Sequence, residues 1–187
     1  MKLHIKNMVC RRCIMAVKME TEKLGIQNAE VNLGQINFRN PEPDDLLLGK
    51  LKAGLNSLGF EIINDKKSRL IEQIKTFVID KIHHSDSELQ NNWSEKIAAK
   101  FHYEYNYISN LFSAIEGITI EQYIIRQKIE KVKELLFYDE LTLSEIAYRL
   151  GYSSAAYLTN QFKKISGMTP GQFRKLLNKK RNPIDHL

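Results

Sequence analysis

Two cysteines, Cys10 and Cys13, stand three residues apart and are the only cysteines among the 187 residues. A pair this close in sequence closes too short a loop to stabilise a fold, so reactivity explains it better than a structural disulfide. Two thiols at this spacing, one in a loop and one in the first turn of a helix, can converge on a single ion. The helix N-terminus and the neighbouring Arg11 and Arg12 should favour thiolates.

The chemistry of the two sulfurs indicates which metal they suit. Without a further cysteine they fit Cu(I), which accepts low coordination, better than Zn(II), which normally takes four ligands. We therefore expect Cu(I), with Ag(I), Hg(II) and Zn(II) as alternatives, and an ion shared between the protomers of a homodimer is left open. Two other interpretations remain: a redox disulfide between Cys10 and Cys13, and two thiols without a function.

The hydrophobic pattern predicts the elements that hold the cysteine pair. Alternating apolar residues indicate short strands at 3–5, 29–33, 36–38 and 60–62, and apolar residues at helical spacing indicate helices at 14–24 and 44–58. Strand, helix, strand, strand, helix, strand is the split βαβ order of ferredoxin-like domains. A thioredoxin-like oxidoreductase also carries a Cys-x-x-Cys after a strand, but it needs more residues than this domain has, and we expect no enzyme.

Met8, Cys10 and Cys13 form a Met-x-Cys-x-x-Cys in the first loop of this domain, and Gly59 and Phe60 follow its second helix. In these features residues 1–65 resemble the heavy-metal-associated domains of copper chaperones and copper ATPases. The resemblance implies that Cys10 and Cys13 are the metal ligands, whereas a methionine at position 8 is more often a core residue under the loop. One departure is Asn7, where the family usually has glycine.

The chain changes character near residue 65. A polar stretch at 64–69 predicts a hinge, and an amphipathic helix from Leu70 begins a second, helical part. Two segments of this part form a loose internal repeat, each with a small residue early, apolar residues in the next helix and a glycine stop at Gly117 or Gly167. We therefore predict two domains, 1–65 and 66–187: an α+β ferredoxin-like domain followed by an all-α domain with two helix-turn-helix motifs.

The second repeat carries a specific motif. Residues 144–154 read SEIAYRLGYSS, and Tyr157-Leu158, Phe162-Lys163-Lys164, residues 167–170 (GMTP) and Phe173-Arg174 follow. In these residues the stretch 69–178 resembles the C-terminal domain of AraC/XylS-type transcription regulators. The resemblance implies two recognition helices that enter successive major grooves on one face of double-stranded DNA.

The faces left free on the two expected recognition helices predict which residues contact DNA. Hydroxyl, amide and methyl groups can read base edges, whereas Lys and Arg hold phosphates without specifying sequence. The expected base contacts are Asn106, Ser109 and Asn110 in the first helix, and Ala156, Tyr157, Thr159 and Asn160 in the second. The expected phosphate contacts are Lys163, Lys164 and Arg174; for Tyr157, packing inside the domain is an equally weighted alternative.

The basic charge lies at one end of the chain. The net charge is +6, and residues 152–181 hold seven basic residues and no acidic one, which is what a phosphate backbone attracts. The first helix-turn-helix segment is slightly acidic instead, so we expect asymmetric binding. With no secretory signal and no membrane-length apolar stretch, we expect a cytoplasmic protein without a membrane partner.

These inferences together predict a transcription regulator whose binding of promoter DNA responds to a soft metal on the cysteine pair. Two rival hypotheses stay open. One is a regulator that senses thiol redox state through a Cys10–Cys13 disulfide, and the other is a metal-carrying binding protein whose helical half is an adaptor.

Overall fold

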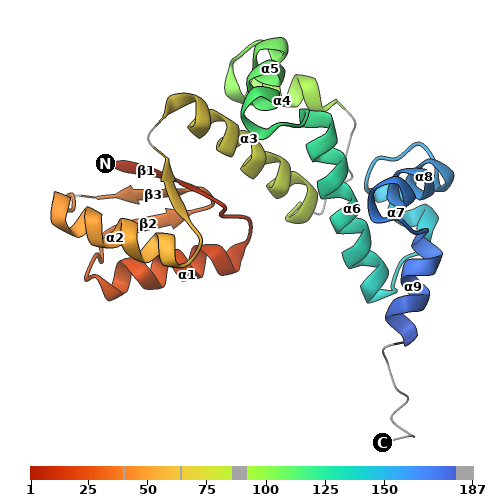
Figure 1. Cartoon of the computed structure of the whole chain (residues 1–187), viewed down its shortest axis with the longest axis horizontal. Helices are drawn as coiled ribbons and strands as arrows, with labels where there is room; N and C mark the ends of the chain where they lie inside the picture. The colour runs from red at the N-terminus through yellow and green to blue at the C-terminus, as the bar shows by residue number, and fades with distance from the viewer. Residues whose placement is uncertain (40, 64, 86–91, 180–187) are drawn as a thin grey trace, which may run out of the picture. The chain divides into compact units, whose positions relative to one another are not determined.

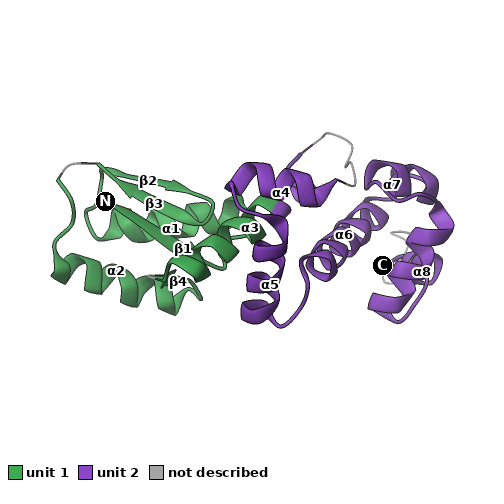
Figure 2. Ribbon diagram, turned by 90° about the horizontal axis from the view of Figure 1, so that it is seen from above, with its two compact units in different colours: residues 1–77 green, residues 78–187 purple. Residues whose placement is uncertain are grey.

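The computed structural model describes residues 1–39, 41–63, 65–85 and 92–179. The chain divides into two compact units, residues 1–77 and 78–187 (Figure 2). The first unit holds a four-stranded sheet with helices, and the described part of the second is helical.

The first unit has the element order that the sequence predicts. Its elements are β1 (Lys2–Lys6), α1 (Arg11–Lys23), β2 (Ala29–Asn32), β3 (Gln35–Phe38), α2 (Asp45–Ser57), β4 (Glu61–Ile63) and the first part of α3 (Lys66–His83). The strands pair antiparallel in the order β2-β3-β1-β4, so β1, the first strand, lies in the middle of the sheet. Its neighbours β3 and β4 hold both sides of the strand from which the cysteine loop departs (Figure 1).

Helices α1 and α2 pack against each other and bury one apolar side each (Figure 1). Ile5 of β1, Val17 of α1 and Leu55 of α2 are buried in this core. Fully burying an aliphatic side chain of this size contributes about 1.5–3 kcal/mol relative to exposure. The core therefore anchors both ends of the loop between β1 and α1.

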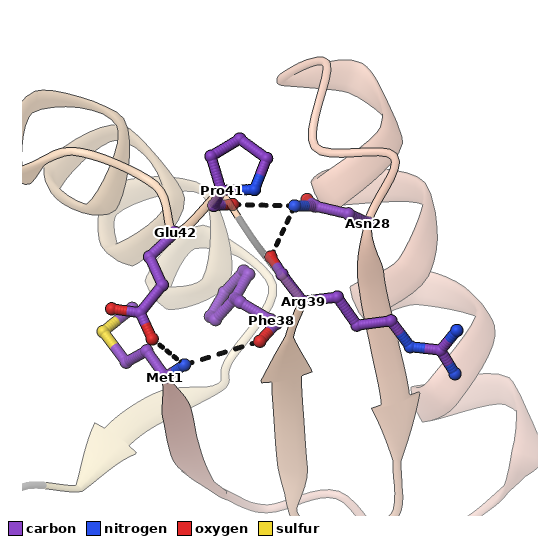
Figure 3. Close-up of polar contacts among 6 residues, drawn as sticks. All are labelled: Met1, Asn28, Phe38, Arg39, Pro41 and Glu42. Carbon is purple, nitrogen blue, oxygen red and sulfur yellow. Dashed lines mark hydrogen bonds and ion pairs between the residues drawn. The ribbon is translucent and has the colours of Figure 1, made fainter.

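Hydrogen bonds close the end of the sheet at which β1 begins. The ammonium group of Met1 pairs with the Glu42 carboxylate in the segment after β3 (Figure 3). The side-chain amide of Asn28 donates to the carbonyls of Arg39 and Pro41, at 2.6 and 2.7 Å. These contacts tie the start of β1 and the turn before β2 to the segment that leads into α2.

The two compact units divide within α3, after residue 77, whereas the sequence places the change of character near residue 65. Helix α3 begins at Lys66 because the Asp65 carboxylate accepts the Ser68 backbone N–H at 2.7 Å, as an N-cap does. The first part of α3 belongs to the first unit: the Gln73 amide lies 3.5 Å from the His4 ring. Of the predicted hinge, residue 64 lies outside the described residues, and 66–69 are helical.

The second unit holds the end of α3, followed by α4 (Trp93–Phe101), α5 (Tyr105–Glu116), α6 (Ile120–Tyr138), α7 (Leu143–Arg149), α8 (Ala155–Ser166) and α9 (Pro170–Lys179). The long helix α6 packs against α5, α8 and α9. It buries eight of its residues, because apolar side chains cover more than one side of the helix. Helix α6 therefore joins the two helix-turn-helix segments, α4–α5 and α7–α8.

The internal repeat is more regular in the structure than in the sequence. Helices α5 and α8 begin fifty residues apart and have twelve residues each. Each ends at a glycine with positive φ, Gly117 at 69° and Gly167 at 77°, a conformation that glycine adopts without strain. A threonine two residues later, Thr119 or Thr169, then caps the next helix.

Among the described residues, no helix is both long enough and apolar enough to cross a lipid bilayer.

Candidate nucleic-acid interface and cysteine pair

Helix α8 packs into the core of the second unit through two buried side chains. Leu158 and Phe162 are fully buried, as their spacing predicts, so the opposite side of the helix faces outward. The Ser154 hydroxyl accepts the Tyr157 backbone N–H at 3.1 Å and caps the N-terminus. A helix fixed at its cap and along one side presents its outer residues on a rigid frame.

The outer side of α8 carries most of the predicted base contacts. Ala156, Tyr157 and Asn160 are exposed. Thr159 is half-buried, and its hydroxyl donates to the Ala155 carbonyl at 2.8 Å. A hydroxyl that bonds within its own helix offers less to a base, so Asn160 is the stronger candidate for adenine.

Tyr157 lies on the surface and not in the core. It is 49% exposed, and its phenol oxygen accepts the Gln161 side-chain amide at 3.1 Å. The ring also packs beside Tyr152, with centroids 6.1 Å apart. The ring is therefore partly packed and partly exposed.

Helix α5 presents a similar but not identical surface. Asn106 and Asn110 are exposed, and Ser109 is half-buried. Tyr107, which is not among the predicted contacts, is 47% exposed and stacks on Tyr103 with ring centroids 5.6 Å apart. The fifty-residue register pairs Tyr107 with Tyr157 and was the signal that could have identified it.

The N-termini of the two recognition helices differ in charge. Glu104 stands at the N-cap of α5 and is exposed, whereas Ser154 stands at the N-cap of α8. A carboxylate stabilises a helix N-terminus but repels a phosphate. The difference agrees with the asymmetric binding that the sequence predicts.

Two of the predicted phosphate contacts are placed for that role. Lys163 and Lys164 are exposed in the last turns of α8. Lys164 lines a hollow of about 530 Å³ together with Arg126 of α6, an exposed cation that the sequence analysis did not single out because it lies in the connecting helix. Lys180 and Arg181, which contribute to the basic end, lie outside the described residues.

Arg174 of α9 has partners within the domain. Its Nε lies 2.9 Å from an Asp139 carboxylate oxygen, and its Nη2 donates to the Leu141 carbonyl at 3.0 Å. Both partners lie in the segment between α6 and α7. The guanidinium therefore holds α9 against this segment. In having these internal partners, Arg174 differs from the exposed Lys163 and Lys164.

We expect Arg174→Gln to lower the free energy of unfolding by about 1 kcal/mol, because a charge-assisted bond and a half-exposed ion pair are lost. Urea denaturation measures this, with Lys175→Gln, an exposed neighbour, as the control. The salt dependence of DNA binding should stay unchanged. Unchanged stability together with a slope reduced by about one would show that Arg174 binds phosphate instead.

The cysteine pair lies at the N-terminus of α1. Cys10 is the N-cap residue and Cys13 lies in the first turn, where its backbone N–H donates to the Cys10 carbonyl at 3.0 Å. The two sulfur atoms are 3.5 Å apart, and both thiols are free and half-buried. The predicted loop-and-helix placement thus brings the sulfurs together.

The helix N-terminus acts on the first thiol. The Cys13 backbone N–H, and to a smaller extent the Cys13 side chain, the Arg12 backbone and the Arg12 charge, lower the pKa of Cys10, although burial opposes them. Of the two influences that the sequence predicts, the helix N-terminus thus contributes more than the Arg12 charge. A thiol with a lowered pKa is a better metal ligand and a better nucleophile.

The loop before the pair is fixed by its neighbours. Asn7 has a positive φ of 71°, which asparagine tolerates better than most residues, and this explains how it can stand where glycine is usual. Its side-chain amide donates to the Gly59 carbonyl at 3.0 Å. Met8 is 2% exposed in the core, which confirms its expected packing role.

The distance between the two sulfur atoms allows both to contact one ion. Two sulfurs that each bind one ion at thiolate distances can be up to about 4.6 Å apart, so 3.5 Å lies within reach of a single bent site. Among the described residues, no group of three or more His, Cys, Asp or Glu could hold a metal.

The comparisons with known proteins concern the helical unit. Residues 97–176 match the family model of a helix-turn-helix domain. The HTH-type transcriptional regulator YtdP of Bacillus subtilis is 30% identical over 113 residues, which are 60% of this chain and 14% of that protein. YfiF of the same organism is 34% identical over 96 residues, or 51% of this chain and 30% of that protein.

A solved structure supports the same relationship. The C-terminal domain of AraT, a response regulator from Geobacillus stearothermophilus, superposes with a TM-score of 0.50 at 28% identity, over 60% of this chain and 88% of that one. The chain thus spans less than a third of YtdP and of YfiF but most of the AraT domain. Residues 97–176 accordingly form a helix-turn-helix domain that is similar to the domains of HTH-type transcriptional regulators.

Proposed function

We propose that this protein is a transcription regulator in which a soft metal on Cys10 and Cys13 alters the affinity of α5 and α8 for promoter DNA. The observation that carries the proposal is the pair of free thiols, 3.5 Å apart at a helix N-terminus, in a chain that also holds an AraC-type domain. Cu(I) is the proposed ion, and Ag(I), Hg(II) and Zn(II) are alternatives.

The topology of the first unit supports a metal-binding role. A βαββαβ order with an antiparallel sheet β2-β3-β1-β4 is the arrangement of ferredoxin-like domains, to which heavy-metal-associated domains belong. The bond from Asn7 to Gly59 joins the cysteine loop to the turn before Phe60, where the family has its glycine-aromatic pair. We propose that the first unit is such a domain.

On DNA, we propose that Asn106, Asn110, Ala156, Tyr157 and Asn160 face base edges, with Ser109 and Thr159 as secondary contacts. Lys163, Lys164 and the newly identified Arg126 contact phosphate. The exposed amides and hydroxyls on the outer sides of α5 and α8 support the first assignment, and the exposed cations support the second.

Metal and DNA binding can be linked only if the metal binds two conformations of the chain with different affinity. Helix α3 is the covalent connection, since the division between the units falls within it. We propose α3 and the residues just before it as the segment that transmits the change. The effect on DNA affinity should be about 5- to 150-fold, the usual size of such coupling.

Thiol redox sensing is the second candidate, and the same sulfur contact favours it. A disulfide needs a sulfur–sulfur distance of about 2.05 Å, so a shift of the two side chains by about 1.5 Å in total would close the bond. The adaptor hypothesis receives less support, because the helical unit matches DNA-binding domains.

The deciding experiment is footprinting and affinity measurement on the upstream region of the protein's own gene, with the protein stripped of metal, loaded with Cu(I), or oxidised. We expect the Cu(I)-loaded form to differ from the stripped form, with little change on oxidation. A change on oxidation alone would favour the redox hypothesis. Equal affinity in all three states contradicts both.

A further inference from the structure

A cavity of about 340 Å³ lies within the second unit, between α6 and the two helix-turn-helix segments. This volume is at the lower end of the range of about 300–1,000 Å³ typical of small-molecule sites, and far above the space of one structural water. Ser94, Ser153 and Tyr157 form an exposed rim, whereas Trp93, Ile124 and Lys128 are buried.

Two polar atoms of the lining residues are buried without a partner. Trp93 is 8% exposed, and its indole N–H has no hydrogen-bond acceptor; the Tyr152 hydroxyl likewise has no partner. A buried polar group without a hydrogen-bond partner is destabilising. Both groups can donate, so the lining as a whole offers hydrogen bonds to an acceptor.

A lysine adds positive charge to the same cavity. Lys128 is 6% exposed, and its ammonium lies 5.2 Å from the centroid of the Tyr152 ring. Burial, and then the nearby Lys96, lower its pKa to about 8, so it is still mainly protonated at neutral pH. Burial also raises the pKa of Tyr152, which keeps that hydroxyl protonated and able to donate.

Among the described lining residues, the only carboxylate is already hydrogen-bonded. Glu121, at the exposed side, accepts the Tyr105 hydroxyl in a short hydrogen bond, which offsets part of its charge. Ile124, Ile125 and Tyr157 supply apolar and aromatic surface, and Ser94, Ser153 and Gln161 add polar groups nearer the opening. An occupant should therefore combine an acceptor group that carries negative charge with a flat or compact apolar body.

We infer that this cavity binds a small carboxylate with an apolar body the size of one ring. The carboxylate accepts from Trp93 and Tyr152 and pairs with Lys128, and the ring lies against the aromatic and aliphatic walls. A carboxylate there supplies the acceptors that the two unpartnered groups lack.

Occupancy of the cavity acts on the DNA-binding surface, a step that rests on the proposed function. Tyr157 and Gln161 of α8 line the cavity, and the bond between them orders the outer side of the helix that carries Asn160. A bound ring changes the packing of the Tyr157 side chain. It therefore changes the rotamer in which Tyr157 faces a base. Coupling of this kind changes DNA affinity by about 5-fold or more.

The test uses benzoate as the probe and the full chain. Trp93 is the only tryptophan of the sequence, so its fluorescence reports occupancy directly, and calorimetry gives the dissociation constant. We expect saturable binding of benzoate but not of neutral benzamide. Lys128→Met should weaken binding about 10-fold or more, Trp93→Phe about 5-fold, and Lys133→Met, on the same helix but outside the cavity, should have no effect.

Each result decides the inference. No saturable binding, as in a cavity that holds only water, overturns it, and so does equal binding by folded Lys128→Met and Trp93→Phe variants. Benzoate binding that leaves the affinity for a fixed duplex unchanged overturns the regulatory step. Benzoate could bind, and bind more weakly to the Lys128→Met and Trp93→Phe variants, while no duplex is bound in any metal state. The proposed function would then be wrong, whereas the assignment of the benzoate site would stand.

Discussion

Serine at Cys10 or at Cys13 should abolish the metal response of DNA binding. A two-coordinate site has no spare protein ligand, and a serine hydroxyl is a poor ligand for Cu(I). In the native protein we expect Cu(I) to change the affinity for DNA by about 5- to 150-fold, and in each variant we expect Cu(I) to leave this affinity unchanged. The measurement is a DNA titration of each variant with and without Cu(I), under reducing conditions.

The controls separate ligand loss from misfolding. Met8→Leu keeps the buried volume and should retain the response, because Met8 packs in the core. Met15→Leu removes an exposed sulfur from α1 and should also retain it. Circular dichroism should show both cysteine variants folded. A metal response that persists in either variant would contradict the assignment of the site.

Alanine at Asn160 should relax sequence preference rather than weaken DNA binding in general. An asparagine that bonds adenine bidentately discriminates against other bases by about 1–3 kcal/mol, or about 5- to 150-fold. The measurement compares the affinity for the operator with that for duplexes changed at single base pairs. Asn110→Ala at the equivalent place in α5 is a matched variant, and Asn56→Ala in the first unit is the control.

Lys164→Ala should behave in the opposite way. It should weaken binding to all duplexes by a similar factor, and reduce the slope of log affinity against log salt by about one, because one phosphate contact is lost. The operator and a scrambled duplex, each measured at several salt concentrations, test this. If Asn160→Ala and Lys164→Ala have the same effect on preference, the division into base and phosphate contacts is wrong.

Short-range patterns in the sequence were sufficient for much of this protein. Hydrophobic spacing predicted the six elements of residues 1–63 and the long helix α6, because burial follows the period of each element. The repeat predicted that Phe112 and Phe162 would be buried and that Gly117 and Gly167 would end their helices. The Cys-x-x-Cys spacing likewise brought both sulfurs to one helix N-terminus, since three residues span less than one turn.

Other features depended on contacts between distant residues. Arg174 matched a phosphate-binding pattern, but its guanidinium lies against Asp139 and Leu141, more than thirty residues earlier in the chain. The cavity collects Trp93 from α4, Lys128 from α6 and Tyr152 from the loop between α7 and α8. The first part of α3 belongs to the first unit, where Gln73 reaches His4. The sequence alone determined the helices, the strands and the thiol pair, since periodicity, capping and spacing act within a few residues. Only the tertiary structure decided which charged and polar side chains are used internally, because that depends on partners that packing brings together.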